Sequence, residues 1–111
     1  MISHNKSRLV IEGSFDEREA AECQARGYRS HVWAELASGE RYPLVFYDPV
    51  RLAQDLESEA ESGNPFLAEP GLIVLEEVTR ENMQAAIDRL AEDGYFVALR
   101  PEKELDSAKT R

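Results

Sequence analysis

Two arginines stand where a small anion could bind. Arg51 and Arg80 each fall in the first turn of a predicted helix that follows a predicted strand. A cation there is unfavourable by about 0.3–1 kcal/mol, because the N-terminus of a helix is the positive end of its dipole. Free amides at such a terminus, together with arginine, favour anions. The residues that we expect beside them, at one edge of the sheet, are Asp48, Thr79, His31 and Arg100.

The same arginines also have a purely structural explanation. Each has carboxylates close by in the sequence, such as Asp48 before Arg51 and Glu81 after Arg80. Exposed ion pairs of this kind are common and contribute little to stability. This explanation is the more frequent outcome, and the sequence leaves both open.

Other residues that could do chemistry lack supporting partners. His31 opposite Asp48 could act as a base with an orienting carboxylate, but no nucleophile stands at a matching spacing. Cys23 lies in an acidic stretch that would raise the pKa of its thiol, so we expect a small buried side chain. His4, His31 and Cys23 show no zinc-site spacing. We therefore predict no catalytic residue, no metal and no cofactor, and favour a protein that is not an enzyme.

Composition and charge narrow the choice of partners. The chain has 111 residues, 42% of them hydrophobic, and carries a net charge of −9. We expect one domain over residues 1–111, with loose tails at 1–7 and 102–111. Such an acidic surface is a poor match for nucleic acid and a better one for a basic protein. A single cysteine and the lack of a long apolar stretch predict a cytoplasmic protein that does not bind membranes.

The order of predicted elements is β-α-β-β-α-β-α-β, which is typical of an α/β or α+β domain with a mixed sheet and helical cover. The first six elements are also compatible with a ferredoxin-like order. Each strand-helix-strand crossover should make its two strands parallel. We expect strands within 8–12, 30–38, 41–48, 72–78 and 95–100, and helices over 15–26, 49–62 and 80–93.

Two of the three helix starts have simple capping signals. Asp48 before Pro49 and Thr79 before Arg80 are predicted N-caps. For the first helix, Ser14 and Glu17 match a capping box. In the second helix, we expect an apolar stripe that comprises Leu52, Leu56 and Ala60, with Ala53 beside it.

A hairpin within Ser30–Asp48 is apolar on both faces, so something should cover each of them. A two-residue Gly39-Glu40 loop of type II′ would place Ser38 opposite Arg41. One face would then carry His31, Trp33, Glu35 and Ala37 with Tyr42, Leu44, Phe46 and Asp48; the other would carry Val32, Ala34, Leu36, Pro43, Val45 and Tyr47.

These observations lead to two functional hypotheses. The first is a non-enzymatic interaction or inhibitor protein, similar in charge and size to immunity-type proteins, that binds a basic protein or a second copy of itself. The residues expected to make that contact are Trp33, Tyr42, Leu44, Phe46, Phe66 and Leu67. The alternative is a small-anion or nucleotide-binding domain that uses the edge around Arg51 and Arg80.

Overall fold

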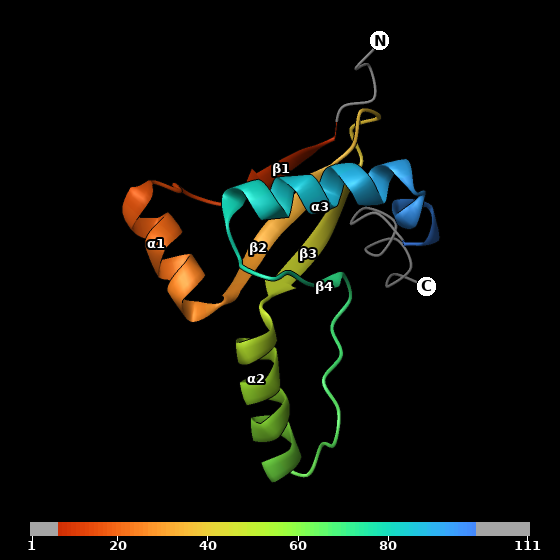
Figure 1. Ribbon diagram of the computed structural model, residues 1–111. Coiled ribbons are helices and arrows are strands. Elements are labelled where there is room, and N and C mark those ends of the chain that lie inside the picture. Colours follow the sequence, from red (N-terminus) through yellow and green to blue (C-terminus); the bar gives the residue numbers. More distant parts are fainter. Residues whose placement is uncertain (1–6, 100–111) are drawn as a thin grey trace.

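The first seven predicted elements form in the predicted chain order, and the computed structural model describes residues 7–99 of the chain (Figure 1). A four-stranded mixed sheet and three helices make one α+β domain, which confirms the predicted class. The elements are β1 (Arg8–Ile11), α1 (Glu17–Arg26), β2 (Tyr28–Glu35), β3 (Arg41–Tyr47), α2 (Pro49–Glu61), β4 (Leu72–Val74), α3 (Arg80–Glu92) and the 3₁₀ helix η1 (Tyr95–Ala98). The predicted tails lie outside the described residues, except that Ser7 is buried and its hydroxyl donates to Asp88.

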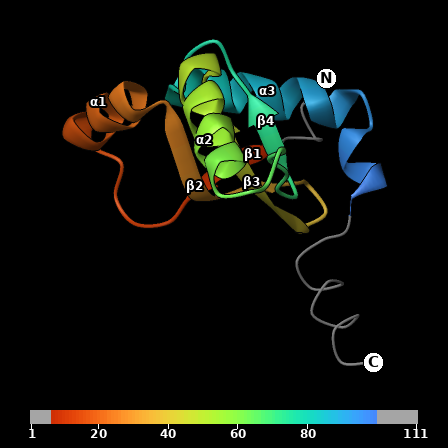
Figure 2. The ribbon, with the colours of Figure 1, turned by 90° about the horizontal axis from the view of Figure 1, so that it is seen from below.

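The strands lie in the order β1-β2-β3-β4, so neighbours in the sequence are neighbours in the sheet. The α2 crossover makes β3 and β4 parallel, as expected. However, β1 pairs antiparallel with β2 although α1 lies between them. The reason is that α1 lies at the side of the sheet and does not cross its face (Figures 1 and 2). The ferredoxin-like arrangement, in which such a crossover joins parallel strands, is therefore not formed.

The prediction of a last strand over residues 95–100 was wrong within the described part of this range. Gly94 turns the chain at a φ of +79°, and Tyr95–Ala98 form η1. Phe96 is buried there with its ring 5.1 Å from that of Tyr42. The predicted strand over 72–78 is also shorter, and Val74 at this edge is 45% exposed. Within residues 7–99, β4 is therefore the last strand of the sheet, and Arg100 lies outside the described residues.

The hairpin closes with a three-residue loop, which corrects the predicted register. Leu36 N–H donates to the carbonyl of Glu40, with N and O 2.9 Å apart, and Gly39 supplies a φ of +94°. A residue with positive φ is typical of the last position in such loops. Val32 consequently lies opposite Leu44, where the two-residue loop would place Glu35. This moves the inward side chains of β2 to the other face.

The core lies between the sheet and α3, which crosses one face of the sheet (Figure 1). Tyr42, Leu44 and Phe46 were predicted to contact a partner. They are 5%, 1% and 0% exposed in this core and are therefore not available to a second molecule. Other buried side chains of the core come from the sheet, from α1 and α3, from η1 and from the segment before α3. They include Leu9, Cys23, Val32, Ala34, Val78, Met83, Ile87 and Phe96.

The opposite face of the sheet carries half-buried apolar side chains, including Trp33 and Pro43, which lie opposite each other. Part of their cover comes from charged side chains. The guanidinium of Arg41 lies 5.9 Å from the Trp33 ring and its Nε is 3.1 Å from Glu35. Arg8 reaches Glu35 from β1, and the hydrogen bonds from the two arginines lower the pKa of that carboxyl. This face therefore carries both apolar and charged side chains, and Trp33 is partly shielded from solvent.

The predicted caps of α2 and α3 are confirmed, whereas that of α1 is wrong. Asp48 accepts from Arg51 N–H at 2.8 Å and Thr79 accepts from Asn82 N–H at 3.1 Å. In α1 the capping residue is Asp16 in place of Ser14, and the helix begins at Glu17. The carboxylate of Asp16 is the group that reaches the free amide of Glu19.

The end of α1 and the start of α2 meet at Gly27 and Asp48. Gly27 ends α1 at a φ of +68°, and its carbonyl accepts from Asp48 N–H with N and O 2.9 Å apart. A Cβ on Gly27 would collide with the Asp48 carboxylate. We call this contact the Gly27–Asp48 junction.

Replacing Gly27 by alanine should therefore destabilise the fold more than Gly63→Ala. Both sites have positive φ, which costs an alanine about 1–2 kcal/mol. No atom of residues 7–99 lies within 4 Å of a Cβ on Gly63, whereas Gly27→Ala must also displace the Asp48 carboxylate. Loss of that cap adds about 1 kcal/mol or more. Urea unfolding of the two variants checks this, and equal losses would contradict the close approach.

Candidate functional site

The edge predicted to bind an anion lies where β3 and β4 end and where α2 and α3 begin. Both polar caps at this edge are already in use, because Asp48 binds the amide of Arg51 and Thr79 binds the amide of Asn82. They satisfy amides that a ligand would otherwise contact. His31 does not lie opposite Asp48, because Tyr28 pairs with Tyr47 there. The suggested base with an orienting carboxylate is therefore not formed.

The two arginines at this edge have different partners. Arg51 Nε lies 2.9 Å from Asp55, its Nη1 donates to the carbonyl of Arg26, and its guanidinium lies 4.9 Å from the Tyr28 ring. Arg80 is exposed and stacks on the ring of Phe15 at 5.8 Å. Arg51 therefore connects the end of α1 to the first turn of α2. An anion site shared by the two arginines remains a prediction.

A different group of residues forms a hollow beside β2. The register between β2 and β3 shifts between Arg29 and Val32, which marks a β-bulge at Ser30 and His31. His31 has a φ of +60°, the one positive value among the described residues other than glycine. The bulge opens a cavity of about 480 Å³, lined by Glu12, Gly13, Arg26, Tyr28, Arg29, Ser30 and His31. We call this cavity the bulge hollow.

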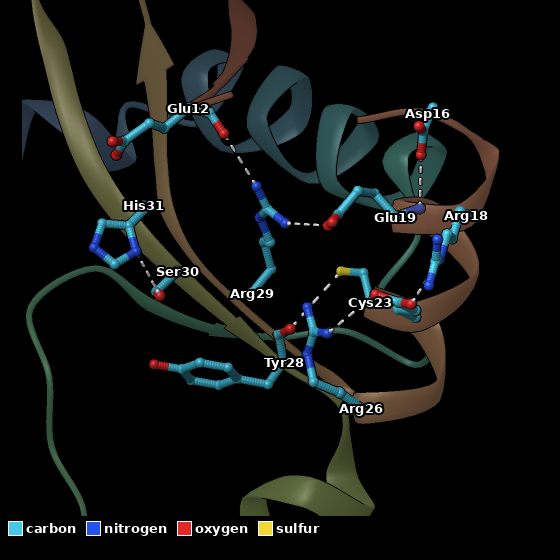
Figure 3. Close-up of polar contacts among 11 residues, drawn as sticks. Glu12, Asp16, Arg18, Glu19, Cys23, Arg26, Tyr28, Arg29, Ser30 and His31 are labelled. Atoms are coloured by element: carbon cyan, nitrogen blue, oxygen red, sulfur yellow. Dashed lines mark hydrogen bonds and ion pairs between the residues drawn. The ribbon is translucent and has the colours of Figure 1, made fainter. Parts of the chain in front are cut away.

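Arg29 forms the inner wall of the bulge hollow (Figure 3). Its side chain is only 12% exposed, and its Nη atoms lie 3.4 Å from a Glu19 oxygen and 3.3 Å from the carbonyl of Glu12. The guanidinium also lies 5.5 Å from the Phe15 ring. Among the described residues, the buried Nε has no hydrogen-bond partner. Arg29 therefore ties the segment before α1 to β2, although one donor is left unsatisfied.

The polar side chains at the outer rim of the hollow make fewer or longer contacts than Arg29 does. Arg26 is 46% exposed, and its ion pair with Glu22 is long, at 4.0 Å. The Ser30 hydroxyl and His31 Nδ1 are 3.1 Å apart. In Figure 3 the Glu12 carboxylate and the His31 ring lie on one side and Arg26 on the other, with Arg29 between. The hollow thus presents hydrogen-bond donors and one carboxylate to the same space.

Sequence reasoning missed the bulge hollow, although one signal was present. Gly27 as the end of α1 places the last turn of the helix next to the start of β2, which brings Arg26 and Arg29 together. The bulge itself has no local signature, because Ser30 and His31 lie in the middle of a stretch that reads as a regular strand. It follows from how β2 fits both β1 and β3.

A second surface is formed by α2 and the segment 62–70, which together we call the arm. The arm points away from the sheet (Figure 1), and no residue of α2 is buried. Val50 is 66%, Leu56 41% and Phe66 63% exposed. The expected apolar stripe of α2 is thus uncovered at Leu56 and Ala60, because the helix projects past the sheet. Leu67 in the same segment is half-buried.

The base of the arm is well packed. Tyr47 is 3% exposed and its ring meets that of Tyr28 edge-on, with centroids 5.0 Å apart. Burial raises the pKa of the Tyr47 hydroxyl to about 12, with further contributions from the charges of Glu69 and Asp55. Tyr47 therefore stays neutral between α2 and the segment that returns to β4.

No helix in residues 7–99 is both long and apolar enough to cross a membrane. Comparisons of the chain with protein-family models, with curated proteins and with solved structures find no match.

The packing of Tyr47 predicts a loss of stability at high pH. Its raised pKa means that the folded state holds the proton more tightly than the unfolded state, whose pKa is about 10. The stabilisation is complete below pH 10 and about 2–3 kcal/mol is lost as the pH rises to 12. The difference in unfolding free energy between wild type and Tyr47→Phe should follow this curve. Titration of all four tyrosines together near pH 10 would contradict it.

Proposed function

We propose that the protein is a non-enzymatic interaction module that binds a basic protein partner through the arm. One observation carries this proposal: α2 contributes no buried residue to the domain. A helix of 13 residues is only marginally stable on its own in water, and most helices gain stability by packing an apolar face. Here that face is still accessible to another molecule.

The exposed groups of the arm suit a protein partner. Phe66 and Leu56 are large apolar side chains held at its surface. Aromatic side chains commonly supply much of the energy of protein interfaces. The packing of Tyr47 and the ion pair of Arg51 with Asp55 fix the base of the arm, so little ordering is needed on binding.

Charge identifies the class of partner. The arm carries five carboxylates, at Asp55, Glu57, Glu59, Glu61 and Glu69, and one arginine, which pairs with the first of them. A basic surface would be attracted to it and would associate faster at low salt. A second copy of this chain, with a net charge of −9, would be repelled. An inhibitor of a basic protein, as immunity-type proteins are, fits this description.

The remaining exposed apolar face is a weaker candidate for this contact. Trp33 on the open side of the sheet is half-buried and stacked with Arg41. A cytoplasmic location is part of the same proposal, which the free thiol of Cys23 supports.

Photo-crosslinking tests the arm directly. A photoreactive phenylalanine analogue placed at Phe66 should trap one basic protein in cells, whereas the same analogue at Val97, which is 87% exposed outside the arm, should not. Changing Glu57, Glu59 and Glu61 to lysine should abolish the product, because the charge of the arm reverses. Equal trapping at both positions, or a product that survives the charge reversal, would overturn the proposal.

Sedimentation equilibrium tests the second copy as partner. Because like charges repel, we expect a monomer of 12.6 kDa at low ionic strength. A stable dimer that Phe66→Ser dissociates would assign the arm to self-association and contradict the proposed basic partner.

A further inference from the structure

The bulge hollow carries two local costs, one in its backbone and one in a buried side chain. His31 holds a φ of +60°, and a positive φ is uncommon for residues with a side chain. The buried Nε of Arg29 lacks a partner among the described residues. Strain of this kind persists only where the surrounding structure enforces it, and it clusters at functional sites. Both features border the same cavity of about 480 Å³, which is large enough for a small organic molecule.

The groups around the hollow define the chemistry of a ligand. Arg26 offers a half-exposed guanidinium whose contact with Glu22 is 4.0 Å long. Ser30 and His31 place a hydroxyl and an imidazole at the opposite rim, 3.1 Å from each other. A guanidinium together with hydroxyl and imidazole groups around one cavity matches the oxygens of a phosphate or carboxylate.

The Glu12 carboxylate places a second requirement on the ligand. Glu12 lines the cavity, and Figure 3 shows its carboxylate on the side of His31. Within residues 7–99 no arginine side chain pairs with this carboxylate, because Arg29 contacts the backbone carbonyl of Glu12. A simple anion alone would be repelled by this carboxylate. A ligand with a hydroxyl group as well as an anionic group would satisfy both sides, since the hydroxyl can donate to Glu12.

We propose that the bulge hollow binds a small hydroxylated anion of the sugar-phosphate type. Arg26 holds the anionic group, Ser30 and His31 donate to or accept from the ligand at the rim, and Glu12 accepts from a hydroxyl. Arg29 is a positioning residue, because its Nη donors are turned to Glu19 and to the backbone carbonyl of Glu12. This site is separate from the arm and does not depend on the proposed partner protein.

NMR titration with glucose 6-phosphate tests the site. We expect saturable shifts at the amides of Ser30, His31 and Gly13, weaker shifts with inorganic phosphate, and none with glucose. Arg26→Gln should raise the dissociation constant about tenfold, the typical effect of losing one charge-assisted hydrogen bond. Arg18→Gln is the matched control, because Arg18 lies on the same helix and also pairs with Glu22. Absence of saturable shifts, or equal effects of the two substitutions, would overturn the proposal.

A second variant separates binding from folding. Glycine adopts positive φ freely, so His31→Gly should raise the melting temperature, by about 3 °C. The same variant should weaken glucose 6-phosphate binding at least threefold, because the imidazole is lost. If the variant is more stable but binds glucose 6-phosphate more weakly, the strained backbone at His31 serves ligand binding at the expense of stability. Unchanged affinity in His31→Gly would contradict the proposed contact between the imidazole and the ligand.

Discussion

The close approach of Gly27 to Asp48 is the constraint on which the placement of both candidate surfaces depends. Gly27 ends α1 with a backbone conformation that favours glycine, and its missing side chain leaves room for the Asp48 carboxylate. That carboxylate caps α2, while the carbonyl of Gly27 accepts the amide of Asp48. The last turn of α1, the start of β2 and the first turn of α2 are therefore held together by a few short polar contacts.

The junction brings the arm and the bulge hollow next to each other through shared side chains. Tyr28 lines the hollow, and its ring also contacts Arg51 and Tyr47 at the base of the arm. The backbone of Arg26 binds Arg51, whereas its guanidinium faces the hollow. A molecule bound in the hollow would therefore contact residues that also fix the arm.

The bulge in β2 decides which face each end of this strand presents. Without an extra residue, the alternation of the strand would turn Arg29 to the open face, away from Val32 and Ala34. With it, Arg29 lies opposite Phe46 and reaches the acidic side of α1, where Glu19 meets it. Tyr28 turns the other way and pairs with Tyr47. The hollow and the contacts of the Tyr28 ring with Arg51 and Tyr47 both depend on this local irregularity.

Features that depend on residues close together in the chain could be predicted from the sequence. Asp48 and Thr79 cap their helices, Gly27 ends α1, and the order of seven elements follows from turn residues and apolar patterns. These features rest on hydrogen bonds that span a few residues. Of the residues in the arm and the bulge hollow, the sequence singled out His31, Arg51, Phe66 and Leu67, but it did not predict their neighbours in space. The hairpin register, the conversion of Tyr95–Ala98 to η1, the burial of Tyr42, Leu44 and Phe46, and the exposure of the arm are visible in the three-dimensional structure alone. Each of these features depends on which distant segments of the chain pack on a given face of the sheet. No pattern among neighbouring residues in the sequence encodes that packing.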